Sequence, residues 1–142
     1  MMNRRQFAPL MLTLLALGAC TPYPAGPGYY SVPPRSVQVY FAFGSAGLTG
    51  QDEAMLRDAA AYASARPGTR IRIIGNADAP GAPEGNAAIS QRRSEVVASA
   101  LNRYGVLRER MSLEANGEAR PVVITNPGGM QPENRRVDIL IY

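Results

Sequence analysis

The chain has 142 residues, which suits one domain, and its 15 basic residues are all arginine, against 11 acidic ones. It has no histidine and only one cysteine, Cys20, which excludes a Ser-His triad, a disulfide framework and a zinc cluster. The acidic residues lack the spacing of a calcium loop, and no basic run is interleaved with aromatic residues. We therefore expect no metal, no cofactor and no nucleic acid.

Residues 1–19 have the layout of a bacterial signal peptide. A short basic segment with Arg4 and Arg5 precedes an apolar run that is too short to span a membrane. Leu17-Gly18-Ala19-Cys20 resembles the lipobox of lipoproteins, which implies cleavage before Cys20 and attachment there of diacylglycerol and a further fatty acyl chain such as palmitate. The alternative is a secreted protein in which Cys20 is incidental.

The export route and destination are suggested by the residues around this signal. Asn3-Arg4-Arg5-Gln6-Phe7 resembles a twin-arginine motif, and an ordinary Sec signal explains it equally well. By resemblance to the sorting rules of enteric bacteria, Thr21 after the cysteine implies the outer membrane. Residues 20–36 comprise this cysteine and a stretch rich in Pro and Gly, for which we expect an extended or flexible tether to a domain at 37–142.

The first half of that domain predicts a strand, a helix and a second strand. The alternation of residues 37–43 is typical of a half-buried strand, and four side chains would share its inner face: Val37, Val39, Phe41 and Phe43. Thr49 is a plausible N-cap of a helix that runs to Ala65. Residues 70–74 predict the second strand.

The second half predicts one more helix and two more strands. A Gly/Pro-rich loop at 75–85 precedes a helix at 86–104 and a short strand at 111–115. Residues 122–125 are expected to be extended, and residues 135–142 predict the last strand. The order β-α-β-α-β-β predicts an α/β sandwich, with a mixed sheet and two main helices on one of its faces.

An acid and an arginine flank this loop. Asp78 follows the second strand, and Arg93 lies fifteen residues later on the next helix. A carboxylate suits an ammonium and a guanidinium suits a carboxylate, so this pair fits a zwitterion, and the helix start adds a positive dipole end. Gly75, Gly81 and Gly85 would let the backbone approach closely. The alternative is that Asp78 and Arg93 simply pair with each other and fix the loop.

These residues belong to an ordered motif, by which residues 37–142 resemble the OmpA-like C-terminal domain found in peptidoglycan-associated lipoproteins. The opening F-A-F-G-S-A-G-L-T at 41–49 is similar to the family's F-D-x-x-S-A-x-L-T. Gly75-Asn76-Ala77-Asp78 stands where the family has G-H-T-D. Further residues match in register: Gly81, Asn86, Ser90, Arg93, Gly117, Asn134, Arg135, Arg136 and Val137.

The resemblance implies non-covalent binding of peptidoglycan through the diaminopimelate of its stem peptide. Asp78 would hold the ammonium of the ligand's far stereocentre, Arg93 would hold its carboxylate, and Asn86 would add a polar contact. Ala77 occupies a ligand-contacting position at which the family has threonine. The function implied is that of a non-enzymatic lipoprotein, anchored in the outer membrane and facing the periplasm, that tethers this membrane to the cell wall.

Two further residues and two alternatives complete the sequence interpretation. Arg135 or Arg136 would rim the site from the last strand, since alternation places one on each face. The departures Ala42, Asn76 and Ala77 predict weaker binding, and they also suit a degenerate domain kept as a protein-interaction or assembly module. Tol-like envelope proteins are candidate partners.

An enzymatic alternative rests on two acids of one loop. Asp78 and Glu84 could form a carboxylate pair that acts on glycan. We expect instead that Glu84 is a solvated charge and that the protein is not an enzyme.

Overall fold

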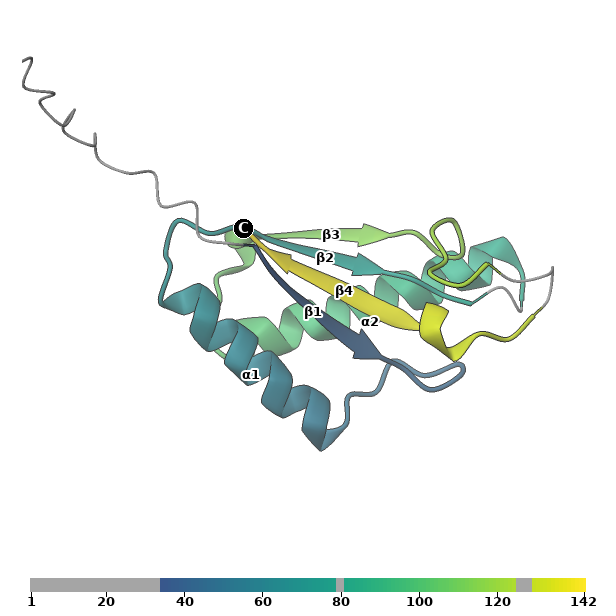
Figure 1. The fold of residues 1–142 in the computed structure, drawn as a ribbon, viewed down its shortest axis with the longest axis horizontal. Helices are drawn as coiled ribbons and strands as arrows, with labels where there is room; N and C mark the ends of the chain where they lie inside the picture. Colours follow the sequence, from purple (N-terminus) through teal and green to yellow (C-terminus); the bar gives the residue numbers. More distant parts are fainter. Residues whose placement is uncertain (1–33, 79–80, 125–128) are drawn as a thin grey trace, which may run out of the picture. The chain divides into compact units, whose positions relative to one another are not determined.

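A four-stranded mixed sheet organises the folded part of the chain, of which the computed structural model describes residues 34–78, 81–124 and 129–142 (Figure 1). Its strands are β1 (Arg35–Tyr40), β2 (Ile71–Gly75), β3 (Met111–Ala115) and β4 (Arg136–Ile141), in the spatial order β1-β4-β2-β3. Strand β4 runs antiparallel to both β1 and β2, and β2 runs parallel to β3. The predicted fold class is thus confirmed. The signal and Cys20 lie outside the described residues.

Helix α1 (Gly50–Ser64) begins at a capping box. The Thr49 hydroxyl accepts a hydrogen bond from the Asp52 amide at 3.2 Å, and the Asp52 carboxylate accepts one from the Thr49 amide at 2.8 Å. This reciprocal pair satisfies two donors at the helix start, as the N-cap prediction requires. The helix packs with small residues on its inner face: Leu56, Ala59, Ala60 and Ala63 are all fully buried.

Helix α2 (Pro83–Arg103) begins three residues before the predicted start at Asn86. The correction has a physical reason: proline is favoured in the first turn, where its missing N–H costs nothing and its φ already suits a helix. The N-cap, Ala82, provides no side-chain hydrogen bond. Along its buried face, polar residues come first and apolar ones follow: Asn86, Ser90, Arg93 and Ser94, then Val97, Ala98, Ala100 and Leu101.

The core lies between the sheet and the two helices, and it includes Val39, Ile73, Val137 and Ile139, each 0% exposed. The prediction that Phe43 faces inward was wrong. Strand β1 ends at Tyr40, the chain turns at Gly44 with φ of 64°, and Phe43 is 59% exposed.

The other boundaries differ in detail. Strand β1 begins at Arg35, within the stretch predicted as linker, and β4 begins one residue later than predicted. Residues 122–124 form bends rather than a strand, and Thr125 lies outside the described residues. Short 3-10 turns, η1 (Arg108–Arg110) and η2 (Pro132–Asn134), precede β3 and β4.

Candidate functional site

A pocket of about 240 Å³ lies at the start of helix α2. Three parts of the chain line it: the β1–α1 loop, the β2–α2 loop and the first turns of α2. The lining residues are Phe43, Gly44, Asp78, Gly81, Ala82, Gly85, Asn86, Ile89 and Arg93. The fold therefore brings together Asp78, Asn86 and Arg93, which the sequence had singled out from separate segments.

The Asp78 carboxylate, 5% exposed, is held from one side. Its Oδ2 atom accepts a hydrogen bond from Arg135 Nη1 at 3.0 Å, and this ion pair is nearly buried, with side chains 6% and 12% exposed. Arg135 is itself oriented by a hydrogen bond from Nε to the Phe41 carbonyl at 3.1 Å. Because Oδ1 accepts nothing from the described residues, this oxygen is left for a ligand donor.

The Arg93 guanidinium is 1% exposed and is held by backbone. It donates from Nε to Ser45 O at 2.9 Å, from Nη1 to Asn76 O at 3.2 Å and from Nη2 to Ala42 O at 3.1 Å. The second N–H of Nη1 and that of Nη2 donate to none of the residues that the structure describes. Burial lowers the pKa of Arg93, while the Asp78 charge opposes this shift. Asp78 therefore forms its ion pair with Arg135, and among the described contacts it forms none with Arg93.

The uncapped start of α2 also faces this pocket. Ala82 offers no side chain to the first amides, so they remain available to an anion, and the helix dipole favours negative charge there. Asn86 is 6% exposed, and its Nδ2 donates to Glu118 Oε2 at 3.2 Å. This bond fixes the amide, whose oxygen remains an acceptor.

A close contact between α2 and strand β2 sets the position of Arg93. A Cβ atom on Gly75 would lie 2.0 Å from Ser90 O and 2.5 Å from Ser94 Oγ, so only glycine permits this approach. Ser94 Oγ in turn donates to Glu114 O at 3.1 Å, and Ser90 Oγ accepts from the Gly117 amide at 3.1 Å. Sequence reasoning did not give these serines a role. What could have indicated this role is that both residues are small and polar and lie on the same buried face of α2 as Arg93.

The two remaining glycines of the loop differ from Gly75. Gly81 has a φ of 121°, which favours glycine, and it lines the pocket. A Cβ atom on Gly85 would meet nothing within 4 Å, so no other described part of the chain approaches it closely, and a close approach of a ligand there stays a prediction.

The two arginines at the start of the last strand form ion pairs with different partners. Arg135 reaches Asp78, whereas Arg136 is 6% exposed and pairs with Asp138, Nη2 to Oδ2 at 2.9 Å. Asn76 joins the second group through a hydrogen bond from Nδ2 to Asp138 Oδ2 at 3.0 Å. Arg136 does not line the pocket.

Ala77 and Asn134, which also belong to the motif, make hydrogen bonds within the protein. Ala77 is 2% exposed and its amide donates to Gly117 O at 2.7 Å. Asn134 satisfies local backbone: its Oδ1 accepts hydrogen bonds from the amides of Val122 and Val123 at 2.8 and 3.1 Å.

The described residues 34–78, 81–124 and 129–142 hold no group of three or more His, Cys, Asp or Glu side chains that could bind a metal ion. No helix within those ranges has the length and apolar character needed to cross a membrane. Glu84 lies exposed in the first turn of α2 and does not line the pocket with Asp78. The carboxylate pair of the enzymatic alternative is not assembled there.

Comparison with known proteins defines the class. A model of the OmpA family matches residues 40–135. The peptidoglycan-associated lipoproteins of Pasteurella multocida and Haemophilus influenzae are each 35% identical over 104 residues, which cover 73% of this chain and 69% and 67% of theirs.

Solved structures agree with this result. The peptidoglycan-associated lipoprotein of Burkholderia pseudomallei is 34% identical, with a TM-score of 0.69, and the match covers 74% of this chain and 89% of that one. The OmpA-like domain of FopA1 from Francisella tularensis, 18% identical with a TM-score of 0.66, shares the fold over 75% of this chain and 71% of its own. The chain belongs to the OmpA family, and its folded part is an OmpA-like domain of the peptidoglycan-associated lipoprotein type.

Proposed function

We propose that this protein is an outer-membrane lipoprotein that faces the periplasm and binds peptidoglycan non-covalently through the diaminopimelate of the stem peptide. Membership of the OmpA family and the names of the most similar relatives support this function. The sequence L-G-A-C at 17–20 supports a lipid anchor on Cys20. Two or more acyl chains hold a protein stably in a membrane because each buried methylene contributes about 0.8 kcal/mol.

The observation that supports it best is the pair of uncommitted groups in the pocket. Asp78 Oδ1 can accept a hydrogen bond from an ammonium, and the two free N–H groups of Arg93 can donate to a carboxylate. The far end of diaminopimelate presents both groups on one carbon. Asp78, Arg93 and Arg135 together have a net charge of +1. The uncapped start of α2 adds a positive dipole end, so the carboxylate of the ligand is attracted more strongly than its ammonium.

Arg135 and Asn86 take supporting roles in this proposal. Arg135 holds Asp78 Oδ2 and so presents Oδ1 to the ligand, and Asn86 contributes its amide oxygen to the pocket wall. Ala77 and Arg136 do not line the pocket and act through the backbone and the sheet, respectively. No step of bond making or breaking is assigned to any of them.

The direct test is retention on purified sacculi of the unlipidated chain 21–142, which contains every described residue. We expect Asp78→Asn to lose retention because it removes the partner of the ammonium while it keeps the shape of the side chain. Glu84→Gln is the matched control, since it removes one negative charge from an exposed site beside the pocket. Free diaminopimelate should release the wild-type protein. Retention of the Asp78→Asn protein at the wild-type level would contradict the proposal.

The alternative, a degenerate domain that acts as an interaction or assembly module, is favoured by Ala77. This residue is 2% exposed and lacks the hydroxyl that the family has at this position. Loss of one neutral hydrogen bond weakens binding by about 0.5–1.5 kcal/mol. If only the Ala77→Thr protein is retained on sacculi, this alternative is correct, and Tol-like envelope proteins become the first partners to examine.

A further inference from the structure

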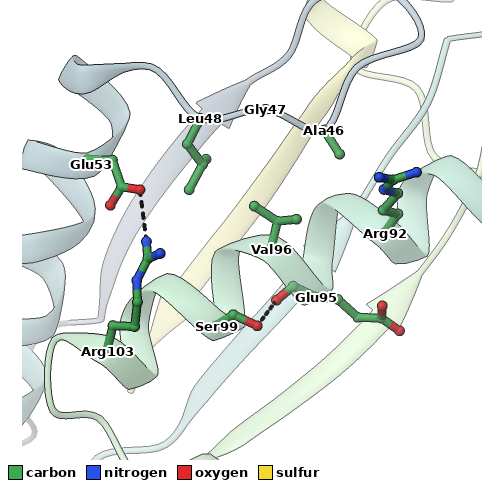
Figure 2. A pocket seen from close by; sticks show the side chains of 9 residues that line it. All are labelled: Ala46, Gly47, Leu48, Glu53, Arg92, Glu95, Val96, Ser99 and Arg103. Atoms are coloured by element: carbon green, nitrogen blue, oxygen red, sulfur yellow. Dashed lines mark hydrogen bonds and ion pairs between the residues drawn. The ribbon is translucent and has the colours of Figure 1, made fainter.

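A second depression, of about 490 Å³, lies between helices α1 and α2 (Figure 2). We call it the interhelix groove. Leu48 and Val96 provide its apolar surface, and charged side chains stand around them. The lining residues are Ala46, Gly47, Leu48, Glu53, Arg92, Glu95, Val96, Ser99 and Arg103. No residue of this groove belongs to the diaminopimelate pocket.

The two ends of the groove differ in charge. At one end Glu53 is neutralised by Arg103, Oε1 to Nη2 at 2.8 Å, and it also accepts a hydrogen bond from the Tyr104 hydroxyl. At the other end Arg92 is exposed and makes no hydrogen bond or ion pair with the described residues. Figure 2 shows the Arg92 guanidinium directed toward the loop at Ala46, whereas the Glu95 carboxylate is directed away from it. The free charge at this end is therefore positive.

This positive end adjoins the diaminopimelate pocket. The β1–α1 loop separates the two sites: Phe43 and Gly44 line the pocket, and Ala46 begins the groove. Arg93 holds this loop by its bonds to Ala42 O and Ser45 O. On α2, Arg93 lines the pocket and its neighbour Arg92 lines the groove.

We propose that the interhelix groove is a second subsite for the same polymer, in which Arg92 pairs with a free carboxylate of the stem peptide that leads to the bound diaminopimelate. This inference rests on the proposed function, because the peptide is delivered to the groove by the zwitterion in the pocket. Leu48 and Val96 pack against the peptide's apolar atoms. The residue before diaminopimelate in the stem is a glutamate joined through its side chain, and its α-carboxylate is the group that Arg92 fits.

The reach of such a peptide agrees with the geometry. Ile89 in the pocket and Val96 in the groove are seven residues apart on α2, a rise of about 10 Å at 1.5 Å per residue. An extended peptide covers about 3.3 Å per residue, so the distance corresponds to about three residues. Diaminopimelate and the preceding glutamate reach across it because the glutamate, which is joined through its side chain, adds more backbone bonds than an ordinary residue.

The test compares three probes by calorimetry on the full-length protein purified in detergent. The probes are free diaminopimelate, the tripeptide L-Ala-D-Glu-diaminopimelate, and the same tripeptide with its glutamyl α-carboxylate amidated. We expect Arg92→Gln to weaken tripeptide binding about two- to fivefold, the range of an exposed ion pair, and to leave diaminopimelate binding unchanged. The amidated tripeptide should bind the wild type as weakly as the acid binds Arg92→Gln. Arg108→Gln, exposed on η1 outside the groove, is the matched control.

Amide chemical shifts locate the contact. The acid tripeptide should perturb Gly47 and Val96, and free diaminopimelate should not. The proposal is overturned if Arg92→Gln leaves tripeptide binding unchanged, or weakens both ligands equally. It is also overturned if the groove amides respond to protein concentration rather than to ligand, which would assign the groove to a second copy of the chain. If the wild type binds diaminopimelate but the amide shifts of the groove do not change with the tripeptide, only this inference fails. If the wild type binds none of the probes, the proposed function fails as well.

Discussion

Arg93 is both part of the binding pocket and part of the framework that shapes it. Its three donated hydrogen bonds end on carbonyls of the β1–α1 loop and of the segment after β2. A charged donor makes each of these bonds stronger than a neutral one. The centroid of the Phe41 ring lies 5.2 Å from the Arg93 guanidinium carbon, within the range of a cation–π interaction. The site residue that a ligand would contact is thus immobilised before the ligand arrives, which lowers the entropic cost of binding.

We predict that Arg93→Lys lowers the free energy of unfolding by about 2–3 kcal/mol, because an ammonium cannot reach carbonyls in three directions and leaves buried acceptors without donors. Thermal unfolding measures this. Arg92→Lys is the control on the adjacent, exposed residue, and its melting temperature should stay at the wild-type value. Equal melting temperatures for both variants would show that the Arg93 bonds contribute little to the fold.

At the scale of elements, the contact between β2 and α2 is closer than most helix–sheet contacts. It depends on the missing side chain of Gly75, since a Cβ atom there would lie 2.0 Å from Ser90 O, which is backbone and cannot rotate away. The helix is thereby drawn onto the end of the strand, next to Asp78. The same glycine opens the motif that identifies the family in the sequence.

We predict that Gly75→Ala lowers the free energy of unfolding by at least about 1–3 kcal/mol, the usual cost of overpacking. Gly85→Ala is the matched control, because Gly85 lies in the first turn of α2 with no atom near its Cβ direction. Alanine favours helix by up to about 1 kcal/mol over glycine, so this variant should be as stable as the wild type or more stable. Urea denaturation of the two proteins compares them, and a loss of stability in Gly85→Ala alone would contradict this account.

Elements were predictable where a local pattern decides them. The capping box at Thr49 and the alternation in β1 lie within a few residues, and both were found in place. The predictions failed where the cause is distant or geometric. Phe43 continues the alternation of β1, yet the strand ends at Tyr40 and the chain turns at Gly44, which has a φ of 64°. The predicted start of α2 was three residues too late, because a proline that follows a glycine-rich loop is usually interpreted as part of that loop.

The sequence could indicate which three side chains lie in one pocket, but not how their charges are paired. The ordered motif located Asp78, Asn86 and Arg93, which share one pocket. The partner of Asp78 is Arg135, which directly precedes β4, and the choice between Arg135 and Arg136 depends on how the chain enters that strand. No local pattern contains this information.

At the scale of the whole molecule, two further ion pairs, besides that of Asp78 and Arg135, join distant parts of the described sequence. Arg72 on β2 pairs with Glu114 on β3, Nη2 to Oε2 at 2.9 Å, and Arg103 on α2 pairs with Glu53 on α1. The hydrogen bond from Tyr104 is the main cause that holds the pKa of Glu53 below its ordinary 4.5, and the hydrogen bond from Arg72 is the main cause for Glu114. Both carboxylates therefore bind a proton less readily in the folded state than in the unfolded state.

We predict that these two glutamates contribute stability in full above pH 4.5, the ordinary carboxyl value, and that their contribution is lost as the pH falls through the lowered folded-state values. The double variant Glu53→Gln/Glu114→Gln should be less stable than the wild type near neutral pH, and the difference should shrink below pH 4.5. Urea unfolding over a pH series measures it. A difference that does not change with pH would mean that the carboxylates act through packing and not through charge.

The position of β4 in the sheet has a consequence for the order of events in synthesis. The last strand of the described chain lies between the first two, and Gln38 Nε2 donates to Asp138 Oδ1 across 100 positions. Strands β1 and β2 do not pair with each other, and the sheet joins them only through β4. A chain that leaves the ribosome or a translocation pore N-terminus first thus keeps an open sheet until β4 has emerged. Closure of the sheet would then report that β4 has cleared the pore.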